Sequence, residues 1–168
     1  AFSVYAAQRG HQVEIFDRGT EIGGQFNYAK QIPGKEEFFE TLRYFNKQIS
    51  LLNIGLNLNQ EKSADELIAA GFDEIVLATG IVPRKLDIKG IEHEKVMSYL
   101  QVLRDKEPVG KRVAIIGARG IGFDVDEFLV EDESLTTNPE KWLQNWGVDK
   151  DYQENGGLIK PKMQEEPI

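Results

Sequence analysis

The sequence predicts an α/β fold in which parallel strands alternate with helices, and three features support this prediction. Residues 13–17 form an apolar, β-branched run just after a glycine turn at Gly10, as expected for a strand that follows a helix. Residues 112–116 form a continuous apolar run of the kind that is buried on both faces of a parallel sheet. This run leads directly into the glycine-rich stretch 117–122 and a helical pattern, an order typical of a βα unit.

Composition and charge restrict the classes of protein to consider. A chain of 168 residues is long enough for one ordinary domain or two small ones, and 40% hydrophobic with 29% charged residues is a globular composition. The net charge of -8 argues against binding to nucleic acid or to anionic membranes, since both require clustered Lys and Arg. The sequence contains neither a long apolar run nor the features of a signal peptide. We therefore expect a cytoplasmic protein.

The chain contains no cysteine, which excludes disulfides, iron–sulfur ligation and a redox-active dithiol within it. His11 and His93 are its only histidines, so the sequence does not predict a histidine-based metal site. Any chemistry performed here would have to come from a bound organic cofactor.

The first unit contains helices, strands and loops in alternation. Its expected elements are a helix at 1–9, a strand at 13–17, a glycine-rich loop at 21–26, a helix at 35–49, a short strand at 56–58, a helix from Ser63 to Gly71 and a strand at 72–78. Ser63 and Glu66 form the sequence pattern of a capping box. Because the chain opens on a helix, we expect a strand and a glycine-rich loop to precede Ala1.

The second unit begins after a connection over 81–110 that holds one short helix from Ser98 to about Lys106. Its expected elements are the strand at 112–116, a helix at 122–130 and a helix capped by Asn138. The last 20 or so residues have no periodicity and are expected to form a loop or to be partly disordered. The predicted organisation is therefore 1–80, 81–110 and 111–168, incomplete at both ends.

The glycine turn at 117–122 is the strongest local motif. Glycines in such a turn let the backbone approach a dinucleotide pyrophosphate, which is bound at the N-terminus of the helix. The usual G-x-G-x-x-G spacing would place glycines at 117, 119 and 122, but residue 119 is Arg119. The arginine either obstructs the cofactor or points outward and pairs with a phosphate. A purely structural βα turn is the alternative.

Three other positions are candidates for contact with a ligand. Asp17 ends its strand where a Rossmann unit places the acid that accepts hydrogen bonds from a ribose. Gly23 and Gly24 could allow close approach of the backbone to a ligand. Thr79 and Gly80 follow a predicted strand at the edge where open α/β sheets bind ligands. The alternatives are a solvated aspartate, a flexible turn and an ordinary strand end.

Taken in order, several segments resemble one family. They are Asp17, residues 21–26, residues 29–38, residues 78–84 and residues 109–117. In this order they closely resemble the C-terminal half of bacterial NADPH-dependent 2,4-dienoyl-CoA reductase, which is related to trimethylamine dehydrogenase and the enoate reductases. The resemblance extends from Ala1 to at least Asp124 and, more loosely, to Gly156 and Gly157.

The resemblance implies an FAD domain with Rossmann-like layers and an inserted NADPH domain. It implies that hydride passes from NADPH to FAD, and that FMN and a 4Fe–4S cluster in other parts of the enzyme then reduce a dienoyl-CoA in fatty acid β-oxidation. The implied FAD-binding residues are Asp17, Gly23, Gly24, Gln25, Thr79 and Gly80, and the implied NADPH-binding residues are Gly117, Gly120 and Gly122. No residue is assigned a catalytic role.

The 168 residues by themselves are expected to have no NADPH-driven activity and to bind FAD weakly or not at all. Two alternatives stay open. One is a related enzyme of the enoate reductase or trimethylamine dehydrogenase type. The other is a cofactor-free α/β fragment that serves as a structural or interaction module and self-associates through unpaired strand edges.

Overall fold

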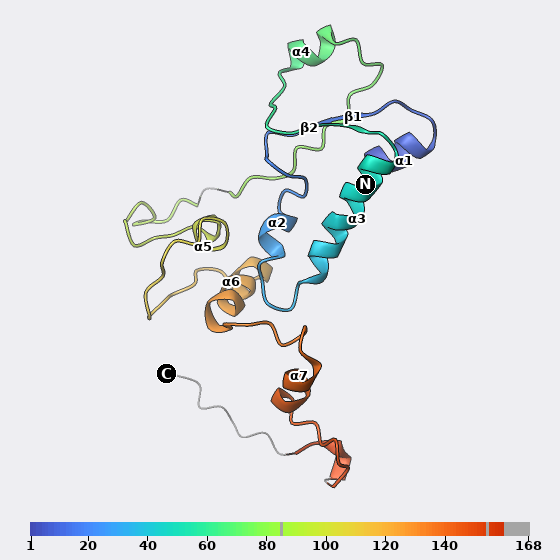
Figure 1. Ribbon diagram of the computed structural model, residues 1–168. Coiled ribbons are helices and arrows are strands. Elements are labelled where there is room, and N and C mark those ends of the chain that lie inside the picture. The colour runs from blue at the N-terminus through green and yellow to red at the C-terminus, as the bar shows by residue number, and fades with distance from the viewer. Residues whose placement is uncertain (85, 154, 160–168) are drawn as a thin grey trace.

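The computed structural model describes residues 1–84, 86–153 and 155–159 and confirms the α/β prediction (Figure 1). The strands β1 (Glu14–Phe16) and β2 (Gly55–Asn57) form a parallel pair in which Ile15 lies opposite Leu56. The helices are α1 (Phe2–Gln8), α2 (Phe26–Ala29), α3 (Glu37–Leu51), α4 (Ala64–Ala69), α5 (Tyr99–Leu103), α6 (Gly120–Val130) and α7 (Pro139–Asn145), followed by the 3-10 turn η1 (Asn155–Gly157).

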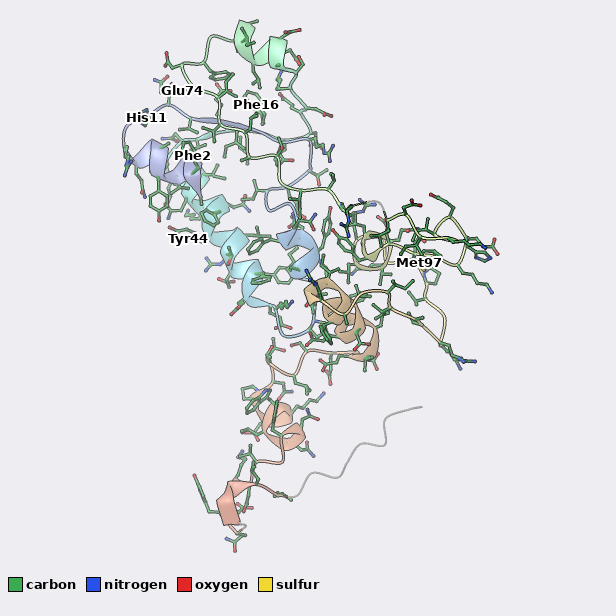
Figure 2. The ribbon with its side chains drawn as sticks, turned by 180° about the vertical axis from the view of Figure 1, so that it is seen from behind. Phe2, His11, Phe16, Tyr44, Glu74 and Met97 are labelled. Atoms are coloured by element: carbon green, nitrogen blue, oxygen red, sulfur yellow. The ribbon has the colours of Figure 1, made fainter. Side chains whose placement is uncertain are left out.

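The first core lies between the strand pair and helices α1 and α3. Val4 of α1, Ile49 of α3 and Ile54, which precedes β2, are all buried there. Burial of an apolar side chain of this size contributes about 1.5–3 kcal/mol. The polar side of α3 faces solvent, and Figure 2 shows Tyr44 directed away from α2. Leu42 and Ile49 of the predicted apolar face are buried, whereas Phe39 is 48% exposed. The bounds of the helix are shifted by two residues from the expected 35–49.

The second core joins two segments that lie far apart in the sequence. Ile32, which follows α2, is 1% exposed and packs with Val102 and Leu103 of α5 and Val125 of α6. Partly buried neighbours, including Tyr28 and Phe128, surround this cluster. As a result, the loop after α2 is held against α5 and α6.

Side-chain caps begin three helices, and the sequence predicts two of them, at Ser63 and Asn138. The Ser63 hydroxyl accepts a hydrogen bond from the backbone N–H of Glu66, and the Glu66 carboxylate accepts one from the N–H of Ser63, which completes a capping box. Ser98 caps α5 in the same way, and Asn138 caps α7. Each such cap contributes about 1 kcal/mol to helix stability.

Two predicted strands, at 72–78 and 112–116, do not form. Both segments are irregular, and apolar side chains within them are largely exposed, with Leu77 at 82% and Ile116 at 72%. A parallel strand needs a neighbouring strand to satisfy its backbone N–H and C=O groups. Within the described residues, β1 and β2 pair only with each other. The β-propensity of these segments alone therefore does not make them strands.

The last described segment extends away from the rest of the chain (Figure 1). Trp142 of α7 and Trp146, the C-cap of the helix, lie against each other with ring centroids 5.7 Å apart, and Val148 pairs with Leu158 in an isolated antiparallel bridge. The expected loop therefore contains some order up to residue 159, and residues 160–168 lie outside the described residues. Among the described helices, none is long and apolar enough to cross a membrane.

Candidate functional site

Asp17 directly follows β1 at the carboxyl edge of the strand pair. Its backbone N–H donates to Asn57 O at 3.0 Å, and its Oδ1 accepts a hydrogen bond from Gly19 N at 2.7 Å. These bonds fix a half-buried carboxylate at the edge where open α/β sheets bind ligands. Among the described residues, Oδ2 has no hydrogen-bond donor, so it is free to accept a bond from a hydroxyl group of a ligand.

Gly23 and Gly24 have positive φ angles of 119° and 50°, but their surroundings differ. A Cβ on Gly23 would lie 2.6 Å from Leu42 Cδ2, so this glycine is required for the loop to pack against α3. A Cβ on Gly24 would meet no atom within 4 Å. The open side of the loop is therefore at Gly24. The next residue, Gln25, accepts a hydrogen bond from the Tyr99 hydroxyl at 3.3 Å, which links the loop to α5.

Thr79 and Gly80 are exposed and lie in irregular chain. Gly80 has a φ of 73°, and a Cβ on it would meet no atom within 4 Å. Within the described part of the chain, no hydrogen bond joins either residue to Asp17 or to the loop at 23–25. The structure therefore does not bring the 79–80 pair together with the other predicted FAD residues through direct contacts.

The turn at 117–122 has the geometry of a dinucleotide turn in two respects. Gly117 has a φ of 118°, which only glycine adopts without strain. A Cβ on Gly122 would overlap the carbonyl oxygen of Gly117, so the absent side chain lets the turn pack tightly against α6. Helix α6 starts at Gly120, and its first turn presents backbone N–H groups that have no acceptors within the helix. This arrangement fits the diphosphate of a dinucleotide.

Arg119 is the N-cap of α6 and has an extended backbone, with φ -122° and ψ -176°. Any residue adopts this conformation, so the backbone does not require the glycine that is usual at this position. The side chain is exposed, as are Lys111 and Arg112 at the start of the same segment. The arginine is therefore accommodated without strain in the turn.

Polar contacts that the sequence did not predict join the loop after α2 to α6 and to residues 134–136. The Lys35 ammonium pairs with the Asp124 carboxylate, and Thr136 Oγ1 donates to Glu36 Oε2 at 2.7 Å. Desolvation raises the pKa of Glu36, but hydrogen bonds from Ser134, Thr136 and nearby backbone N–H groups outweigh it and lower the pKa to about 2. Glu36 is thus a hydrogen-bonded anion at neutral pH. Partners 89 or 100 residues apart leave no local signal in the sequence.

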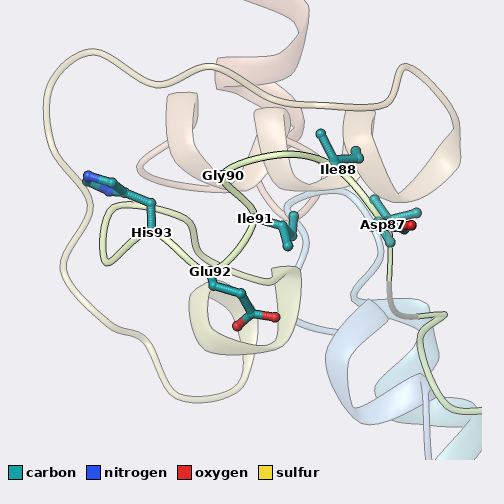
Figure 3. A pocket seen from close by; sticks show the side chains of 7 residues that line it. Asp87, Ile88, Gly90, Ile91, Glu92 and His93 are labelled. Atoms are coloured by element: carbon teal, nitrogen blue, oxygen red, sulfur yellow. The ribbon is translucent and has the colours of Figure 1, made fainter.

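A shallow hollow in the connection is lined by residues 86–88 and 90–93 (Figure 3). The side chains of Glu92 and His93 point away from each other there, and His93 Nδ1 accepts a hydrogen bond from Lys95 N. Across the described residues, no group of three or more His, Asp or Glu side chains could hold a metal ion. Within that part of the chain, the prediction of no metal site is therefore not contradicted.

The fold and the turn together define a Rossmann-like α/β protein of the dinucleotide-binding class. The chain belongs to the pyridine nucleotide-disulphide oxidoreductase family, whose model matches residues 1–131.

Individual relatives are reductases of different substrates. The chain is 31% identical over 129 residues to bilirubin reductase of Mediterraneibacter gnavus, covering 75% of this chain and 20% of that protein. It is 32% identical over 145 residues to cinnamate reductase of Clostridium sporogenes, covering 83% of this chain and 20% of that protein. A solved complex of 2-naphthoyl-CoA reductase with 2-naphthoyl-CoA matches with a TM-score of 0.71 and 35% identity, covering 76% of this chain and 19% of that one.

The chain spans about a fifth of the length of each of these relatives. Family membership confirms the predicted oxidoreductase class and the predicted Rossmann-like fold. The relatives do not single out 2,4-dienoyl-CoA reductase, so that assignment stays a prediction, as do the domain limits, the individual site residues and the cytoplasmic location.

Proposed function

We propose that the protein is an NADPH-dependent flavin reductase resembling 2,4-dienoyl-CoA reductase. Residues 1–80 would form part of its FAD-binding domain, 81–110 a connector, and 111–168 the beginning of its NADPH-binding domain. The observation that carries the proposal is the tight packing of Gly117 against Gly122 at the start of α6, because this shape leaves helix N–H groups open to a diphosphate.

On the FAD side, Asp17 would accept hydrogen bonds from the adenosine ribose. The open face at Gly24, with Gln25 beside it, would lie along the diphosphate and ribityl chain. Thr79 and Gly80 would line the same site. Gly23 would act indirectly, because its contact with Leu42 sets the position of the loop.

On the NADPH side, Gly117 and Gly122 would shape the turn, and Gly120 would offer the first N–H of α6 to the diphosphate. When bound, the two cofactors would supply the chemistry, a hydride transfer from nicotinamide to flavin. The residues of this chain then act by binding and positioning, and none is assigned as acid, base or nucleophile.

From the resemblance and from the names of the relatives, the proposed substrate class is a compound with a carbon–carbon double bond conjugated to a carbonyl group. Cinnamate and a dienoyl-CoA share a carbon–carbon double bond conjugated to a carboxyl or thioester carbonyl. The family resemblance places FMN and a 4Fe–4S cluster in other parts of such an enzyme, where the substrate would be reduced.

The test uses the full-length protein purified without oxygen. NADPH should bleach the visible absorption of bound flavin, and 2,4-dienoyl-CoA should restore it, with cinnamate and trimethylamine as alternative substrates. Faster reaction with cinnamate would support the enoate reductase alternative, and flavin reduction by trimethylamine would support the dehydrogenase. A protein that binds no flavin would refute the proposal in favour of a cofactor-free module.

Substitution of Asp17 by asparagine should weaken FAD binding in the full-length protein about tenfold, equivalent to ~1.4 kcal/mol. The amide oxygen can still accept the hydrogen bond from Gly19, so the amide NH₂ replaces the oxygen proposed to accept from the ribose. FAD affinity is measured by titration of the apoprotein. Asp73→Asn, at an exposed position, is the control, and equal FAD affinity in both variants would remove Asp17 from the site.

Reversal of charge at Arg119 should weaken NADPH binding about tenfold, because the exposed side chain lies at the N-cap beside the proposed diphosphate. Arg119→Glu is compared with Lys89→Glu, which makes the same change of charge at an exposed position in the connector. Affinity is followed by fluorescence titration with NADPH. Tighter binding by an Arg119→Gly variant would instead indicate that the arginine obstructs the cofactor.

A further inference from the structure

The loop between α2 and α3 is joined to α6 by an ion pair that spans the two proposed cofactor segments. Lys35 lies just before α3, and Asp124 lies one turn into α6. Their side chains are 33% and 25% exposed, so this pair is less solvated than the pair of Arg43 with Glu40, whose side chains are 73% and 64% exposed. Partly buried pairs are screened less than exposed pairs, so this contact has more effect on the relative position of its two segments.

A second connection lies beside the ion pair. Glu36 accepts hydrogen bonds from Thr136 Oγ1 at 2.7 Å and from Gly34 N at 3.1 Å. Gly34 N also donates to Ser134 Oγ at 3.0 Å, and the Ser134 and Thr136 hydroxyl oxygens lie 2.8 Å apart. One carboxylate therefore organises a small network between the loop and the segment after α6. Hydrogen bonds to an ionised acceptor are about twice as strong as neutral ones.

A buried apolar cluster holds the same loop against α5 and α6. Ile32 lies in the same loop, is 1% exposed, and contacts Val102, Leu103 and Val125. Because close-packed side chains have few alternative arrangements, the loop cannot slide over α5 and α6 without breaking this cluster. We call the loop residues Ile32, Lys35 and Glu36, with Val125, Asp124 and Thr136 opposite them, the inter-segment clasp.

The clasp lies close in sequence to the residues proposed to contact each cofactor. Asp124 comes two residues after Gly122, and Lys35 comes ten residues after Gln25. We infer that Lys35 and Glu36 are positioning residues, which hold the FAD-side loop against the nicotinamide-side helix α6 and so set the approach of the two cofactors. This inference rests on the proposed function, and it assigns neither residue a direct contact with a cofactor.

The main test measures hydride transfer in the full-length protein. Lys35→Asp, Asp124→Lys and the double variant that exchanges both charges are mixed with NADPH under anaerobic stopped-flow, and the rate of flavin bleaching is recorded. Since small misplacement of reacting groups can slow a reaction up to about a hundredfold, we expect each single variant to be about tenfold slower. The double variant should regain most of the rate. FAD content and NADPH affinity should stay within about twofold of the unmodified protein.

A second variant keeps the test decisive where a charge reversal prevents folding. Thr136→Val removes one hydrogen bond to Glu36 while nearly keeping the side-chain volume, and it should also slow flavin bleaching. Glu40→Gln, which breaks the exposed pair with Arg43 on α3, is the matched control and should react at the normal rate.

Two kinds of failure are distinguishable. An unmodified protein whose flavin is not bleached by NADPH would refute the proposed function. If the unmodified protein reacts, and the Thr136→Val and charge-reversed variants react equally fast, only the inference about the clasp is overturned. A slower rate that arises only from lost FAD or a lowered melting temperature would likewise overturn it, because it would show a structural role.

Discussion

Gly122→Ala is expected to disrupt the turn before α6 and to weaken NADPH binding at least tenfold. The new Cβ would overlap the carbonyl oxygen of Gly117 and lie 3.0 Å from its carbonyl carbon. These are backbone atoms, so no side-chain rotation relieves the overlap, and the turn must move away from the helix. Overpacking of this kind costs about 1–3 kcal/mol, and here the displaced groups are those proposed to receive the diphosphate.

The matched control for this variant is Gly120→Ala, two residues earlier in the same turn. A Cβ on Gly120 meets no atom within 4 Å, and the residue is the first of α6. Alanine in a helix is preferred over glycine by about 1 kcal/mol, so this variant should keep or raise the order of α6. Hydrogen exchange measures the order of the α6 backbone in each variant, and titration with NADPH measures the affinity for the cofactor. Equal protection of α6 in the two variants would show that the turn is not as tightly packed as the structure has it.

The difference between these glycines shows what the sequence could and could not predict at the site. The spacing of Gly117 and Gly122 predicts a dinucleotide turn, and the structure shows a positive φ at Gly117 and a close approach of Gly122 to the Gly117 carbonyl. The sequence alone gives every glycine in the motif the same proposed role toward the cofactor. The structure separates them, because Gly122 is constrained by a neighbouring carbonyl whereas Gly120 faces open space.

The fold was predictable where the determinants are local. Ser63, Ser98 and Asn138 cap helices where the sequence places them, because a capping side chain and its N–H partner are only three residues apart. Helix α6 begins two residues earlier than expected, at Gly120, since Arg119 serves as its N-cap. Such a shift is small beside the 11-residue length of the helix.

Non-local determinants were not predictable from the sequence. The strand at 112–116 was expected from its apolar, β-branched residues, but a strand also needs a partner that local composition cannot specify. The pairing of Lys35 with Asp124 was missed for the same reason, because nothing near either residue indicates the other. Sequence patterns therefore identified the class of protein more readily than the contacts that join its two units.

Gly23→Ala and Gly24→Ala are expected to differ in how much they destabilise the protein and in how they affect FAD binding, although the two glycines are adjacent. The first adds a Cβ 2.6 Å from Leu42 Cδ2 in a backbone with φ of 119°, so it combines overpacking with backbone strain and should destabilise the FAD-side unit by about 2–4 kcal/mol. The second adds a methyl group in open space at φ of 50°, where alanine costs only about 1–2 kcal/mol.

The two variants should also differ in FAD affinity: the variant that destabilises the protein less should weaken FAD binding directly. If FAD passes along the open face of the loop, the methyl group in Gly24→Ala lies in its path and should lower FAD affinity about tenfold in the folded protein. In Gly23→Ala, FAD should be lost only together with the melting transition, because its methyl group points into the contact with α3. Thermal melting of the full-length protein with and without added FAD distinguishes the two cases. A Gly24→Ala protein that binds FAD normally would show that the cofactor does not approach the loop at this face.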